Sequence, residues 1–106
     1  MSAIFISSLF EERPWQWGLR GDPYLWEEMQ SEFIAAPLPE SAEQLKVTLE
    51  AAFESLTGIP LSSEQEFIFI ERLAHGGMSS GGVSLRFWRE TAIPLLIGRY
   101  NHAKEK

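Results

Sequence analysis

The sequence contains no cysteine, one aspartate and two histidines. Without cysteine the chain has neither a disulfide framework nor a thiolate zinc site, so packing alone has to hold the fold together. Two histidines are too few to form a metal centre with the usual ligand spacing. These absences exclude the disulfide-stabilised and zinc-bound classes of small protein, and we expect no cofactor.

The sequence also lacks long hydrophobic runs. No stretch approaches the ~20 apolar residues that a membrane-spanning helix needs. The first ten residues lack the basic segment of an export signal, and Ser7 and Ser8 interrupt their apolar run. We therefore expect a cytoplasmic protein that does not act on a membrane.

Aromatic and aliphatic residues, in contrast, are plentiful. Hydrophobic residues make up 44% of the 106 positions, and they include four Trp, seven Phe and two Tyr. Burying one large apolar side chain is worth about 1.5–3 kcal/mol, so the chain can form its own core. We expect one domain over residues 1–106, with a core from about residue 4 to 100 and a short charged tail over 101–106. The four Trp are expected in that core, not on a surface where bases stack.

Negative charge is concentrated in the middle of the chain. Residues 27–66 contain nine Glu and a single basic residue, Lys46, whereas residues 67–106 carry six basic residues and three Glu. The whole chain has a formal net charge of −6. An acidic surface disfavours contact with phosphate backbones and attracts basic partners, so we expect no direct binding of nucleic acid.

Two amphipathic segments in the first half predict helices. The first begins at Asp22, a good N-cap, and runs to about Ile34. The second begins at Ser41, which forms a capping box with Gln44. It ends at Gly58, a residue typical of helix C-termini.

A third helix is predicted from Ser84, an N-cap, to Tyr100. Pro94 lies inside it and has no N–H to donate to the carbonyl of Glu90. We therefore expect a kink near Glu90.

Strands are predicted over residues 3–10, 14–19 and 66–73, and the glycine-rich residues 75–82 are predicted to form a loop. The strand over 66–73 is apolar on both faces, so we expect other elements to cover both of them. The order of elements predicts an α+β fold, in which three main helices pack on a small sheet of two to three strands in a single compact domain.

The glycine-rich segment contains a catalytic-looking pattern. Residues 77–81 match the G-x-S-x-G motif of a nucleophilic serine, but no suitable histidine and carboxylate accompany them. Four glycines before a helix could also cradle a phosphate, although the lysine of a P-loop is missing. We therefore predict no catalytic residue and expect the segment to contact a partner through His75, Met78, Ser79 and Ser80.

Several blocks of the sequence carry a resemblance to a known family. They are WGLRGDPYLW at 17–26, LTG at 56–58, ERLAHGGMSSGGVS at 71–84, FWRE at 87–90 and IPLL at 93–96. With these blocks the chain resembles a family of small bacterial immunity proteins of polymorphic toxin systems, which include contact-dependent growth inhibition. The resemblance implies a cytosolic antidote that binds one cognate toxin C-terminal domain, often a nuclease, and blocks its active site or the access of substrate.

The charge pattern indicates which surface such an antidote would use. Because nuclease toxins hold phosphates, they tend to be basic, and we expect the acidic faces of the first two helices to bind the toxin. The residues predicted to do so are Glu27, Glu28, Glu32, Glu43, Glu50 and Glu54. Two alternatives stay open: a protein-interaction module unrelated to toxins, and an enzyme or small-ligand-binding protein that uses the glycine-rich loop.

Overall fold

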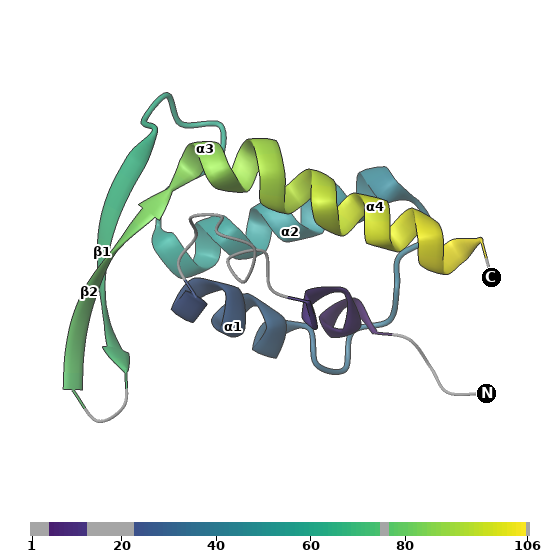
Figure 1. Ribbon diagram of the computed structural model, residues 1–106, viewed down its shortest axis with the longest axis horizontal. Coiled ribbons are helices and arrows are strands. Elements are labelled where there is room, and N and C mark those ends of the chain that lie inside the picture. Colours follow the sequence, from purple (N-terminus) through teal and green to yellow (C-terminus); the bar gives the residue numbers. More distant parts are fainter. Residues whose placement is uncertain (1–4, 13–22, 75–76, 106) are drawn as a thin grey trace.

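The computed structural model describes residues 5–12, 23–74 and 77–105 (Figure 1). A 3-10 helix, η1 (Ile6–Phe10), precedes helices α1 (Pro23–Glu32) and α2 (Ala42–Thr57). Strands β1 (Phe67–Ala74) and β2 (Gly77–Ser84) form an antiparallel hairpin. A last helical stretch comprises α3 (Leu85–Phe87), the π-helical segment η3 (Trp88–Ala92) and α4 (Ile93–Lys104). The predicted α+β single domain is confirmed.

The core lies between the helices and is built around aromatic rings. Trp26 and Trp88 are fully buried, with ring centroids 5.8 Å apart, and Phe53 of α2 lies 5.6 Å from Trp88. The indole N–H of Trp26 donates to the carbonyl of Phe10 at 2.8 Å. The prediction of core tryptophans is therefore confirmed for Trp26 and Trp88, while Trp15 and Trp17 lie outside the described residues.

Both ends of α2 form as the sequence predicts. The hydroxyl of Ser41 accepts from the backbone N–H of Gln44 at 3.2 Å. The side chain of Gln44 accepts from the N–H of Glu40 at 3.0 Å, one residue earlier than in the usual capping box. Gly58 ends the helix with φ at +78°, a left-handed conformation that suits glycine. The predicted cap of α1, Asp22, lies outside the described residues.

The strand predicted over residues 3–10 is wrong over residues 6–10, whereas Phe5 forms an isolated antiparallel β-bridge with Pro37. Residues 6–10 form η1, because Ile6, Leu9 and Phe10 recur at helical spacing and are all buried. The N–H of Ile6 donates to the carbonyl of Ala36 at 2.9 Å, which fixes η1 beside the segment that follows α1. The strand predicted over 14–19 lies outside the described residues.

The π-helical segment η3 lies where we expect a kink, immediately before Pro94. The N–H of Ile93 donates to the carbonyl of Trp88, five residues earlier, so the helix widens immediately before the proline. The hydroxyl of Ser84 accepts from the N–H of Phe87 at 3.0 Å, which confirms the predicted N-cap. At the other end α4 continues to Lys104, so residues 101–104 of the predicted tail are helical.

The hairpin corrects two expectations. The strand predicted over 66–73 forms as β1, but the predicted loop over 75–82 is wrong, because residues 77–84 form β2 and pair with β1. The expectation that both faces of β1 are covered is wrong as well. Ile68 and Val83 are buried against the helices, whereas the side chains of Phe67 and Phe69 remain 52% and 77% exposed. Figure 1 shows the hairpin at one end of the helical layer, with its far end directed away from the body.

Candidate protein-interaction surface

Helix α2 divides its residues between the core and the surface. Leu45, Leu49 and Phe53 are buried, as the apolar spacing predicts. Glu43, Glu50 and Glu54 lie on the other side, where Glu43 and Glu54 are exposed and Glu50 is half-buried. In the described part of the chain, none of these three carboxylates forms an ion pair with a basic side chain.

An exposed valine lies among these carboxylates. Val47 follows Glu43 by four residues and precedes Glu50 by three, so all of them lie along one side of the helix. Its side chain is 65% exposed. We call Glu43, Val47, Glu50 and Glu54 the α2 stripe. Sequence reasoning missed Val47, although its spacing from Glu43 and its position outside the leucine stripe could have revealed it.

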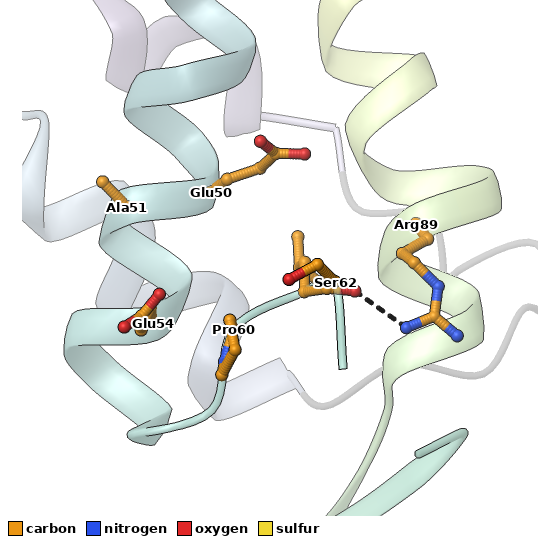
Figure 2. A pocket seen from close by; sticks show the side chains of 7 residues that line it. Glu50, Ala51, Glu54, Pro60, Ser62 and Arg89 are labelled. Atoms are coloured by element: carbon orange, nitrogen blue, oxygen red, sulfur yellow. Dashed lines mark hydrogen bonds between the residues drawn. The ribbon is translucent and has the colours of Figure 1, made fainter. Parts of the chain in front are cut away.

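Two residues of the α2 stripe, Glu50 and Glu54, border a groove, which is shown in Figure 2. The groove has a volume of about 240 Å³. In Figure 2 the carboxylate of Glu50 reaches into the space between α2 and the helical stretch that carries Arg89. The residues that line this acidic groove are Glu50, Ala51, Glu54, Pro60, Leu61, Ser62 and Arg89.

Arg89 bonds to the chain segment that lines the acidic groove at Leu61. One nitrogen of its guanidinium donates to the carbonyls of Leu61 and Ser63, at 2.8 and 2.9 Å. Because these bonds occupy it, Arg89 acts as a clamp between η3 and the segment before β1, and it lies more than 4 Å from the carboxylates beside it. The sequence contains no local pattern that predicts this role, since Arg89 lies 28 positions after Leu61 and 26 positions after Ser63.

Two further arginines of the C-terminal part also make internal contacts. Arg99 donates to the carbonyls of Leu9 and Glu12, at 2.6 and 2.8 Å, and joins α4 to the N-terminal segment. Arg86 pairs with Glu90 at 2.6 Å on the surface of the last helical stretch. Three of the six basic residues of this half of the chain therefore make contacts within the protein.

The glutamates of α1 do not line the acidic groove. Glu27 and Glu32 are exposed, and Glu28 is half-buried. Partial burial raises the pKa of Glu28, and the carboxylate of Glu32 one turn later raises it further. Of the residues predicted for partner binding whose side chains the structure describes, Glu50 and Glu54 line the groove.

The glycine-rich residues do not form the expected loop. Met78, Ser79 and Ser80 lie in β2, where their backbones pair with Leu73, Arg72 and Glu71, and His75 lies outside the described residues. A nucleophile elbow requires its serine at a sharp turn between a strand and a helix, whereas the middle serine of the motif lies inside β2. Residues 77–81 therefore do not form the turn of a nucleophile elbow.

A second exposed feature lies on the hairpin. The rings of Phe67 and Phe69, here called the aromatic pair, contact each other edge to face, with centroids 5.3 Å apart. Sequence reasoning missed this pair because a run of apolar residues in a strand normally indicates burial on both faces.

In the described residues no group of three or more His, Cys, Asp or Glu is arranged to hold a metal ion. Over the same part of the chain, no helix combines the length and apolarity that crossing a membrane requires. Comparison of the chain with protein-family models, curated proteins and solved structures finds no match.

Proposed function

We propose that this protein is a cytosolic immunity protein that binds a basic toxin domain, and that it acts by binding and not by catalysis. The observation that carries the proposal is the α2 stripe, in which three glutamates without ion pairs in the described residues share one side of the helix with an exposed valine. Glu50 and Glu54 of this stripe also line the acidic groove. Acidic side chains around an apolar centre suit a protein interface whose partner offers lysine or arginine around an apolar patch.

Repulsion between the glutamates of the α2 stripe slightly lowers the stability of the free protein. Like charges three or four residues apart destabilise a helix by about 0.2–0.5 kcal/mol per pair. Glu50 and Glu54 are such a pair. A basic partner relieves this repulsion and gains long-range attraction, which raises association rates by about 10- to 1,000-fold.

The proposed mechanism is occlusion of the toxin. A nuclease binds the phosphates of its substrate with basic groups, and a row of carboxylates can occupy the same groups. Arg86 and Arg99 pair with Glu90 and Glu12, so they do not offset the negative charge that α2 presents to the partner. Arg89 donates to neutral carbonyls and keeps its positive charge, which offsets part of the charge of Glu50 and Glu54 within the groove. Toxin covered in this way can no longer admit nucleic acid.

The test uses the toxin domain encoded directly upstream of this protein's gene, which is where a cognate toxin is expected. We expect the two proteins to co-purify and the toxin's nuclease activity to fall on binding. Replacing Glu43, Glu50 and Glu54 with Lys should slow association at least about tenfold in low salt, measured by stopped-flow fluorescence. The difference should shrink in high salt, since salt screens the exposed charges.

A matched variant controls for net charge alone. Replacing Glu11, Glu40 and Glu105 with Lys changes the charge by the same amount, and these residues are also exposed but lie outside the α2 stripe. This control should slow association much less. Equal slowing by both triple variants would show that only net charge matters, and the absence of any complex would reject the proposed function.

A further inference from the structure

The aromatic pair brings together two of the four large apolar residues that are exposed on the described surface. Phe67 and Phe69 are two residues apart in β1, so both rings lie on the same face of the hairpin, opposite the buried Ile68. The other exposed large apolar residues, Ile34 and Val47, lie singly on or beside different helices. Adjacent exposed aromatic rings are typical of interaction sites, whereas single exposed residues are common on any surface.

Strand β2 leaves the aromatic pair uncovered. The residue opposite Phe69 is Gly82, which has no side chain, and the residue opposite Phe67 is Ser84. The hydroxyl of Ser84 is engaged as the N-cap of α3. In a sheet, side chains on the neighbouring strand normally cover such rings. No side chain of β2 therefore covers the aromatic pair on this face of the hairpin.

The backbone of β1 also has an open edge beside the rings. The described sheet has two strands, so β2 pairs with only one side of β1. The N–H of Leu85 donates to the carbonyl of Glu66 at 2.8 Å, directly before the first residue pair of the ladder. Because hydrogen-bonded and non-hydrogen-bonded pairs alternate in an antiparallel ladder, the backbone N–H and C=O of Phe67 and Phe69 point to the open edge.

Charge around the aromatic pair indicates what can occupy it. Glu64 and Glu66 precede β1 and are exposed, and Glu90 is exposed beside the hollow that Ser84 helps to line. The basic residue in this hollow, Arg86, is paired with Glu90. Among the described side chains around the hairpin, the charge is therefore net negative. This charge opposes a second copy of this chain, which would bring the same glutamates, and it opposes the anionic surface of a membrane.

We propose that β1 receives an extended, basic segment of the partner protein, which adds a third strand at the open edge and covers the aromatic pair with its apolar side chains. This inference rests on the proposed function for the identity of the partner. The added strand gains backbone hydrogen bonds along β1, while its lysine or arginine side chains meet the glutamates that flank the rings. Phe69 is the expected anchor of this contact, because it is the more exposed of the two rings.

The first experiment uses the toxin domain encoded upstream. Phe69→Ser should increase the dissociation rate at least about tenfold with little change in melting temperature, because the ring is mostly exposed in the free protein. Ile34→Ser is the matched control, since Ile34 is 71% exposed but lies after α1, and it should leave the dissociation rate unchanged. Binding should also slow hydrogen exchange at the amides of Phe67 and Phe69. A complex that Phe69→Ser does not weaken and that does not protect these amides would overturn the inference and leave the proposed function standing.

A second experiment needs no toxin. The probe is a synthetic ten-residue peptide of alternating Val and Lys, compared with a peptide of alternating Val and Glu. We expect the Val–Lys peptide to protect the amides of Phe67 and Phe69 and to lose binding to the Phe69→Ser protein, even if the upstream toxin does not bind at all. Equal binding of both peptides, or binding unaffected by Phe69→Ser, would overturn the inference. So would a concentration-dependent dimer that Phe69→Ser dissociates, because the occupant would then be a second copy.

Discussion

Gly82 is the residue on which the position of the Phe67 ring depends. A Cβ atom at Gly82 would lie 2.3 Å from the ring's Cζ atom, much closer than real contacts allow. The backbone of Gly82 has no positive φ, so the need for glycine arises from the ring above it and not from the backbone. A glycine in a strand that faces an aromatic ring across the ladder is a known way to pack such a ring.

The first prediction is that Gly82 and Phe67 are energetically coupled. Gly82→Ala should lower the free energy of unfolding by about 1 kcal/mol in the wild-type protein, because the ring is displaced. In a Phe67→Ala background the same substitution should be neutral or stabilising by up to about 0.4–1 kcal/mol, because it restricts the unfolded chain. Urea denaturation of the four proteins measures the coupling. Equal effects in both backgrounds would show that the ring can move aside at no cost.

At the scale of the element, the glycine that ends α2, Gly58, can be compared with Gly98 within α4. Gly58 and Gly98 both have open space where a Cβ would be placed, but Gly58 has φ at +78° and Gly98 lies within α4. Gly58→Ala should destabilise by about 1–2 kcal/mol, since side chains strain a left-handed residue. Gly98→Ala should stabilise by about 0.5–1 kcal/mol, since alanine favours a helix. Opposite shifts in melting temperature are the expected result, and a loss of stability in both variants would contradict it.

The elements that sequence predicted well are those with local signals at their ends. Ser41, Gly58 and Ser84 mark helix termini through bonds to residues a few positions away, so their pattern is visible in the chain itself. Pro94 removes one donor, and the π-helical turn lies directly before it, although the sequence predicts a kink there and not a π-helix. In these places local chemistry and the fold agree.

The elements that sequence missed depend on partners far along the chain. Strand β2 consists largely of glycine and serine, which strands disfavour, and it forms because β1 pairs with it and Val83 is buried. The segment over 6–10 looks β-like by composition, yet burial of Ile6, Leu9 and Phe10 makes it helical. Tertiary burial overrides local preference in both cases.

At the scale of the whole molecule, the acidic side of the candidate site could be predicted and its apolar centre could not. The leucine stripe of α2 fixes which side is buried, and so it fixes that Glu43, Glu50 and Glu54 face outwards. The exposure of Phe69 and the clamp formed by Arg89 result from contacts between elements, which no local pattern encodes. Sequence therefore predicts the charge that attracts a partner better than the contacts that hold one.

The stability of the folded protein should depend on pH through Glu28. Burial raises the pKa of Glu28, and repulsion from Glu32 adds to it, so the folded protein holds a proton at Glu28 more tightly than the unfolded chain does. A raised carboxyl pKa lowers stability as pH rises from about 4.5 through the raised value, and the loss remains complete at neutral pH. Glu28→Gln should therefore be more stable than wild type at pH 7, and the difference should vanish near pH 4. Glu32→Gln removes only the smaller cause and should gain less, about 0.2–0.5 kcal/mol, the usual cost of a like-charged pair at this spacing. Thermal unfolding of the three proteins between pH 4 and pH 7 measures both effects. If Glu28→Gln were less stable than wild type at pH 7, contacts of the Glu28 carboxylate would outweigh its burial and its repulsion from Glu32.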